Sequence, residues 1–135
     1  MKRWNLTFGL LLLLTFILSG QYLRHVFTPE HLDQLVQRAQ IRSNHIYLLF
    51  SALLNLLVSN IPSEHENKGR KCADHLARLL LILAGFLLVA GFWYEHDGDL
   101  SNRQYTRYGL FGTLGAVGLL LVNSWLPQKA NRQED

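Results

Sequence analysis

The sequence predicts an all-α integral membrane protein, a bundle of four transmembrane helices with a short amphipathic helix in its first outer loop. Three observations lead to this fold class. First, 49% of the 135 residues are hydrophobic, and they are gathered into four long runs with little charge. Second, each run approaches the roughly 20 helical residues needed to cross a hydrocarbon layer of about 30 Å. Third, the charged residues are concentrated in the short segments between the runs. Because lipid offers the backbone no hydrogen-bond partner, the runs must be helices, and the chain is expected to form one domain.

The four predicted spans cover residues 4–23, 46–63, 76–94 and 108–127. The third span is the shortest, because only the 16 positions from Leu79 to Tyr94 are uncharged. It reaches full length if the side chain of Arg78 extends to the lipid headgroups.

The first run has one alternative interpretation, a cleaved signal peptide. Lys2 and Arg3 precede the apolar run, and Ser19 and Gly20 supply small residues. The apolar core is longer than the ~7 to 15 residues typical of signal peptides, and no A-x-A pattern follows it. An uncleaved first span is therefore preferred.

The distribution of basic residues predicts that both termini lie in the cytoplasm. Eight of the 13 Lys and Arg residues fall in the amino end, the second loop and the carboxyl tail, whereas five fall in the first and third loops. Basic residues that flank spans stay preferentially on the cytoplasmic side. The expected location is the cell membrane, which in a bacterium is the inner membrane.

Residues 29–42 are predicted to form the amphipathic helix. Thr28, Pro29 and Glu30 resemble a helix start, since Thr can cap, Pro is tolerated at the first position, and Glu favours the positive end of the helix dipole. Apolar residues then recur at helical spacing: Leu32, Leu35, Val36 and Ala39. We expect this helix to lie on the outer interface or over the bundle mouth and to turn into the second span near 42–44. A structural cap is the simpler role, and docking of a partner or of lipid is the alternative.

Two stripes are expected inside the membrane. The first is polar and lies within an arc of about 80° on the second span; its residues are Asn44, Ser51, Asn55 and Ser59. The second is made of small residues on one face of the fourth span, where a neighbouring backbone could approach closely; its residues are Gly109, Gly112, Thr113 and Ala116, with Asn123 nearly in line. We expect both stripes to face the bundle interior and to meet each other. Packing is the simpler interpretation, and a polar path or cofactor cleft centred on Asn55 is the alternative.

Three histidines at span ends, His25, His45 and His96, are the weak candidates for a metal or haem site at the outer rim. No two of the six histidines have the i, i+3 or i, i+4 spacing that usually marks ligands on one helix. Solvated interfacial histidines are the simpler interpretation. The acidic segment 95–99 is interpreted as a turn, since it does not match the calcium-loop pattern.

The leading functional hypothesis is a non-enzymatic accessory or interaction subunit whose partners are the lipid bilayer and another membrane protein, or a second copy of itself. It rests on the absence of catalytic motifs, the small soluble portion and the lack of charged residues in the middle of the spans. The alternatives are a metal- or haem-binding protein that uses the outer-rim histidines, then a small transporter or oligomeric pore, and last a lipid-modifying enzyme with His31, Glu30 and Arg42. Nucleic-acid binding is not expected, because the basic residues flank membrane spans rather than form one basic face.

Overall fold

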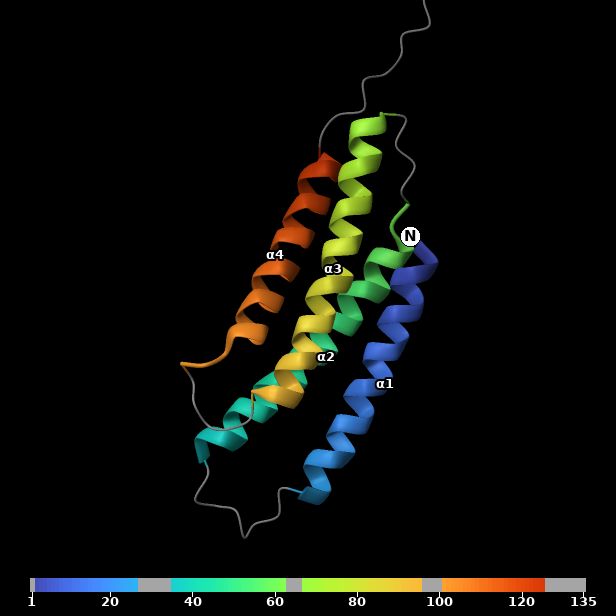
Figure 1. Ribbon diagram of the computed structural model, residues 1–135. Coiled ribbons are helices and arrows are strands. Elements are labelled where there is room, and N and C mark those ends of the chain that lie inside the picture. The colour runs from blue at the N-terminus through green and yellow to red at the C-terminus, as the bar shows by residue number, and fades with distance from the viewer. Residues whose placement is uncertain (1, 27–34, 63–66, 96–100, 126–135) are drawn as a thin grey trace, which may run out of the picture.

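The computed structural model describes residues 2–26, 35–62, 67–95 and 101–125, and four helices account for nearly all of them. Helix α1 spans Lys2–Val26, α2 Leu35–Asn60, α3 Lys68–Tyr94 and α4 Gln104–Trp125. All four are long and apolar enough to cross a membrane. The prediction of a four-helix bundle of this kind is confirmed within these ranges (Figure 1).

Helices α2 and α3 begin well before the predicted spans, at Leu35 rather than 46 and at Lys68 rather than 76. The predicted spans were based on the uncharged runs of the sequence. A helix, however, continues through charged residues until a capping residue or a proline ends it. At the start of α3, the side chain of Asn67 caps the helix by accepting from the Gly69 backbone N–H at 2.9 Å. At the end of α2, Pro62 follows closely and disfavours helical geometry in the residue before it.

The expected amphipathic helix at 29–42 is only partly within the described ranges. Residues 35–42 form the first turns of α2, and α2 continues through 42–44 without interruption. The predicted turn into the second span at 42–44 is therefore wrong, because nothing at those positions breaks a helix and Asn44 faces inward in the same helical register. Residues 29–34 lie outside the described ranges.

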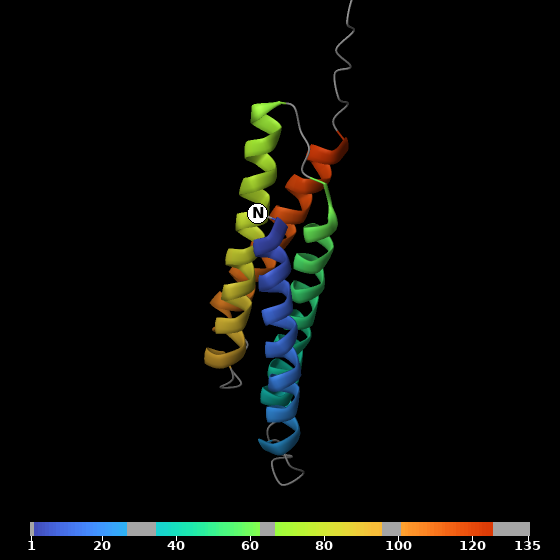
Figure 2. The same ribbon diagram turned by 90° about the vertical axis from the view of Figure 1, so that its right-hand side faces the viewer.

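The helices pack as two antiparallel pairs, α1 with α2 and α3 with α4, joined mainly through α2 and α3 (Figures 1 and 2). Glycines allow close approach within the pairs. A Cβ on Gly9 of α1 would lie 3.0 Å from the side chain of Leu56 in α2, and one on Gly109 of α4 would lie 2.8 Å from the side chain of Leu88 in α3. Helix α4 thus lies against α3 and extends along the outer edge of the bundle.

The two pairs are displaced relative to each other along the bundle axis. Both views show the first turns of α3 extending beyond the start of α1 and the end of α2 (Figures 1 and 2). Asn5, near the start of α1, is level with Arg78, whereas Asn123, near the end of α4, is level with Arg70. Arg70 and Arg78 are eight positions apart, so the end of α4 lies about 12 Å farther along α3 than the start of α1.

The buried core is narrow, and the outer surface is apolar. One core cluster contains Ile41, Leu48, Leu88 and Phe92, and another contains Val58, Leu81 and Ala116. Large apolar side chains such as Leu14, Phe86 and Phe111 are more than half exposed. A soluble protein rarely exposes so much contiguous apolar surface, whereas a lipid environment favours it.

The glycine contacts predict a difference in stability between two positions on α4. Gly109→Ala is expected to lower the free energy of unfolding by about 1 to 3 kcal/mol, because the added methyl meets Leu88 and the Ala84 carbonyl oxygen. Gly118→Ala is the matched control, since a Cβ there would have no atom of the described residues within 4 Å. Unfolding in mild detergent, followed by circular dichroism as SDS is added, measures both. Equal destabilisation by the two substitutions would contradict the packing of α4 on α3.

Candidate functional site

The end of the bundle where α1 begins holds a buried cluster of polar side chains, here named the Arg78 cluster (Asn5, Asn55, Asp74 and Arg78). The side chain of Arg78 has no exposed surface. Its Nε donates to Asp74 Oδ2 at 2.8 Å, and its two terminal nitrogens donate to the carbonyl oxygens of Val58 at 2.7 Å and Ile61 at 3.1 Å. The guanidinium therefore caps the carbonyl end of α2, where the Val58 oxygen also accepts from the Ile61 N–H at 3.3 Å, and its positive charge lies at the negative end of that helix dipole.

The same cluster includes α1. Asn5 Nδ2 donates to the backbone oxygen of Arg78 at 3.4 Å and to Asn55 Oδ1 at 3.0 Å. Asn55 in turn donates to the Ser51 carbonyl oxygen at 2.9 Å. Since Asn5, Asn55 and Arg78 are all buried, these contacts tie α1, α2 and α3 together.

The expectation that Arg78 extends to the headgroups is wrong. The i, i+4 spacing from Asp74 gives the guanidinium a carboxylate on its own helix, and the end of α2 supplies two further acceptors. With three acceptors inside the bundle, the side chain folds inward.

A second arginine of α3, Arg70, donates to a backbone carbonyl in the last turn of α4. The Arg70 guanidinium donates to the backbone oxygen of Asn123 and, at 3.4 Å, to its Oδ1. Asn123 Nδ2 donates back to the Arg70 carbonyl oxygen at 3.2 Å. Both helices that end on this side of the bundle thus have a guanidinium from α3 at their last turn.

The opposite end of the bundle holds the Glu95 cluster (Ser43, Asn44, Glu95, Arg103 and Thr106). Glu95 follows α3 and is buried. Its carboxyl oxygens accept from the backbone N–H groups of Tyr105 at 2.6 Å and Thr106 at 3.2 Å, and also from the Thr106 hydroxyl. These N–H groups belong to the first turn of α4, where a helix leaves donors unpaired, so Glu95 caps a helix that starts nine residues after it.

Asn44 connects α2 to this cluster. Its Nδ2 donates to the carbonyl oxygens of Gly91 at 2.9 Å and Glu95 at 3.2 Å, which closes the end of α3. Its Oδ1 accepts from the Thr106 hydroxyl at 3.2 Å and from Arg103, whose guanidinium also donates to Ser43 Oγ at 3.0 Å. The cluster therefore joins α2, α3 and α4.

The predicted stripes occupy different neighbourhoods. In the polar stripe, Asn44, Ser51 and Asn55 are buried and Ser59 is partly buried, with its hydroxyl donating to the Leu56 carbonyl oxygen. In the small-residue stripe, Gly109, Thr113 and Ala116 are buried and Gly112 is partly buried. This second stripe packs on Ala84 and Leu88 of α3.

Both stripes face the bundle interior, but they do not face each other over most of their length, because α3 lies between α4 and the polar face of α2. The stripe residue Asn44 reaches α4 only at Thr106, at one end. The centre of the polar stripe instead faces α1 and α3, where Ser51 lies near Gly85.

The predicted histidine site is only partly within the described ranges. His25 is exposed, and His45 stacks on Phe16 with ring centroids 4.1 Å apart while its Nδ1 lies 2.9 Å from Ser19 Oγ. His96 lies outside the described ranges. Among the residues that the structure describes, no three His, Cys, Asp or Glu side chains are grouped to hold a metal ion.

One buried amide has no assigned contact. The side chain of Gln40 is on the inner face of α2, one turn before Asn44, and no residue of the described ranges forms a hydrogen bond with either of its polar atoms. Buried amides are normally paired, and nothing in the structure explains this one.

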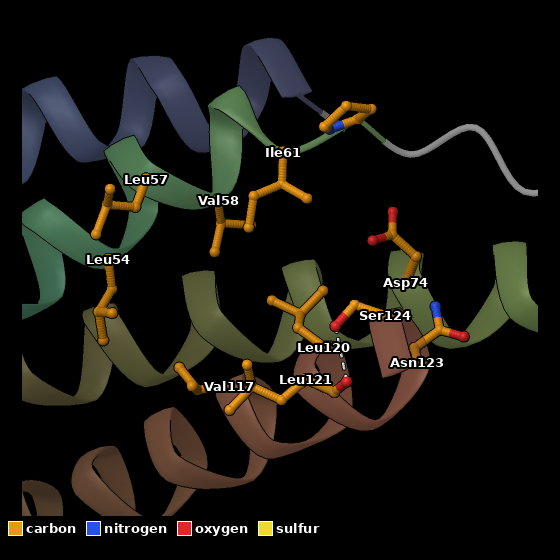
Figure 3. A pocket seen from close by; sticks show the side chains of 11 residues that line it. Leu54, Leu57, Val58, Ile61, Asp74, Val117, Leu120, Leu121, Asn123 and Ser124 are labelled. Atoms are coloured by element: carbon orange, nitrogen blue, oxygen red, sulfur yellow. Dashed lines mark hydrogen bonds between the residues drawn. The ribbon is translucent and has the colours of Figure 1, made fainter. Parts of the chain in front are cut away.

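A groove of about 220 Å³ runs between α2 and α4 at the Arg78 end (Figure 3). Its walls are almost entirely apolar side chains, and polar groups lie at one end of it, on α3 and α4. The lining residues are Leu54, Leu57, Val58, Ile61 and Pro62 of α2 and its carboxyl end, Asp74 of α3, and Val117, Leu120, Leu121, Asn123 and Ser124 of α4. The groove exists because α4 packs on α3 and leaves its side toward α2 uncovered.

Comparison with known proteins gives no match. No protein-family description, no curated protein and no solved structure is significantly similar to this chain.

The polar groups in both clusters mainly pair with helix ends, so their chemistry is that of capping. Sequence reasoning missed the roles of Asp74, Arg78 and Glu95. Asp74 and Arg78 carry a signal that could have been used, since opposite charges four positions apart beside an apolar run favour a pair on one helix face. Glu95 carries no such signal, because its partners belong to another helix.

The Arg78 cluster predicts a large loss of stability on Arg78→Met. The substitution leaves Asp74 buried without its partner and removes the guanidinium donors of the Val58 and Ile61 carbonyls, so the free energy of unfolding should fall by about 3 to 5 kcal/mol. The control is Arg107→Met, which changes an exposed arginine and should cost less than about 0.5 kcal/mol. SDS titration in detergent measures both. A loss below about 1 kcal/mol for Arg78→Met would show that the cluster does not hold the helices together.

Proposed function

We propose that this chain is a multi-pass cell-membrane protein, of the inner membrane in a bacterium, and that it acts as a non-enzymatic accessory subunit. In this proposal both termini are cytoplasmic, and the chain works by binding a transmembrane helix of another membrane protein. The observation that carries the proposal is the outer face of α4, which presents two glycines that the described helices leave largely uncovered.

Four glycines follow each other at intervals of three along α4, and they do not share one face. Three residues turn a helix by 300°, so the series winds away from α3. A Cβ on Gly109 or Gly112 would meet α3 within 3.2 Å, whereas one on Gly115 would find only Leu80 at 3.9 Å and one on Gly118 would find nothing within 4 Å. The later two glycines therefore lie on the side that the bundle leaves open.

The residues around these glycines support docking of a helix. Phe111, Leu114 and Val122 are each more than 60% exposed and flank Gly115 and Gly118 on the same side of α4. Glycine costs a helix about 1 kcal/mol relative to alanine, and a glycine that faces lipid recovers none of this through packing. A helix that approaches the glycines closely would recover it, since association in lipid depends on van der Waals contact.

The polar groups favour the same conclusion over an enzyme. In both clusters, polar side chains bind backbone groups at the ends of the chain's own helices. Examples are the carbonyl oxygens of Val58 and Gly91 and the N–H of Thr106. A protein whose buried polar groups maintain its own fold is suited to present a surface.

The docking face is tested by photocrosslinking in native membranes. A photoreactive side chain at Val122, on the outer face of α4, is expected to give one adduct of discrete mass, and the adduct should disappear with Gly118→Leu. The control position is Leu14, which is 52% exposed on α1. Adducts of equal yield from both positions, or an adduct that survives Gly118→Leu, would sink the proposal. An adduct of twice the chain mass would replace the heterologous partner with a second copy.

The orientation is tested with the natural cysteine. Cys72 is the only cysteine of the sequence, and it is exposed near the start of α3. A membrane-impermeant maleimide should leave it unlabelled in intact spheroplasts and should label it after permeabilisation. The control is Cys72→Ser combined with Asn102→Cys, which moves the thiol to an exposed position beside the start of α4 and should reverse the pattern. Labelling of Cys72 in intact spheroplasts would contradict cytoplasmic termini.

A further inference from the structure

We propose that the groove between α2 and α4 binds one acyl chain of an anionic phospholipid, whose phosphate lies against Arg70 and Lys71 of α3. This inference is independent of the outer face of α4. It rests on the shape and lining of the groove and on the charges at its end.

The groove has the form that an acyl chain requires. Leucines line both walls, Leu54 and Leu57 on α2 and Leu120 and Leu121 on α4, and they leave a volume of about 220 Å³ between them (Figure 3). The helices that form the walls contact α3 far more than each other, and their direct hydrogen bond, from Thr106 to Asn44, lies at the opposite end of the bundle. A hydrocarbon chain fills such a space without any polar group to desolvate.

The polar side chains at one end of the groove indicate where the lipid headgroup would lie. Figure 3 shows Asp74, Asn123 and Ser124 at the same end of the groove, beside Ile61. Asp74 is paired with Arg78, so its carboxylate is neutralised where it borders the groove. The Ser124 hydroxyl donates to the Leu121 carbonyl oxygen at 2.8 Å and stays on α4.

Among the described residues, the charges on α3 beyond that end are positive. Arg70 and Lys71 precede Asp74 by four and three positions, so they occupy the same face of α3, one turn farther out. Lys71 is exposed, and Arg70 is partly exposed beside Asn123, which borders the groove. A guanidinium and an ammonium one turn beyond an apolar groove suit a phosphate whose acyl chain lies in the groove.

The choice of a lipid over a partner helix follows from this charge. An apolar helix gains nothing from Arg70 and Lys71, whereas an anionic phospholipid satisfies the apolar walls and the basic end together. The predicted ligand must therefore combine an apolar chain and an anionic headgroup in one molecule.

The test is lipid binding to the purified, delipidated full chain, measured by native mass spectrometry. Phosphatidylglycerol and phosphatidylcholine with identical acyl chains are the probes. The wild-type protein is expected to bind phosphatidylglycerol at least about fivefold more tightly, because one basic residue near an anionic headgroup contributes about 1 kcal/mol. Lys71→Gln should lower the affinity for phosphatidylglycerol about fivefold and leave phosphatidylcholine unchanged. The matched control, Lys2→Gln, removes the same charge from α1 and should change neither affinity by more than about twofold.

Two substitutions test the acyl chain. Leu121→Trp on α4 places an indole in the groove and should abolish retention of both lipids, whereas Leu11→Trp on α1 should leave retention intact. The two leucines are similarly exposed, at 56% and 55%, and only Leu121 lines the groove. Equal wild-type affinity for the two lipids, an equal effect of Lys2→Gln and Lys71→Gln, or lipid retained by Leu121→Trp would each overturn the proposal. The proposal would also be overturned if the groove held a second copy of the chain instead of a lipid, and Leu121→Trp released that copy.

Discussion

The arrangement of the helices depends on the hydrogen bonds of the Arg78 guanidinium. It is fully buried, it donates to Asp74 within α3 and to two carbonyls at the end of α2, and its own backbone oxygen accepts from Asn5 of α1. One residue thereby fixes three helices at one level. Because a buried charge is tolerated only when its hydrogen bonds are complete, these partners also fix one another.

The same requirement recurs at the other helix ends. Glu95 accepts from the first turn of α4, Asn44 donates to the last turn of α3, and Arg70 donates to the last turn of α4. A helix that ends in or near lipid cannot rely on water for these groups, so side chains from neighbouring helices supply the partners. The capping contacts therefore set the vertical register of the bundle, while glycines such as Gly109 set the distances between its axes.

The sequence predicted the four helices well, because an uncharged run of about 20 residues has few alternatives in a chain this short. It predicted their ends poorly, since polarity does not terminate a helix, and so α2 and α3 were underestimated. Burial of Asn44 and Asn55 followed from their shared helical face, but their partners did not. Asn55 meets Asn5, fifty residues away, and α4 meets α3 rather than α2, both of which depend on packing order. Helical periodicity gives the direction of a side chain on its own helix and carries no information about which helix lies opposite.

In a bilayer, the displacement of the two helix pairs would have a consequence for the lipid around them. At the Arg78 end, the last turn of α4 stands about 12 Å farther along the axis than the first turn of α1, so the apolar surface of α4 is offset along the axis from that of α1. A bilayer of uniform thickness meets such an offset by letting the protein tilt or by deforming locally beside it, and each ångström of mismatch costs a fraction of a kcal/mol. The tilt of the protein and the local thickness of the bilayer thus depend on where Arg70 and Arg78 of α3 contact the neighbouring helices.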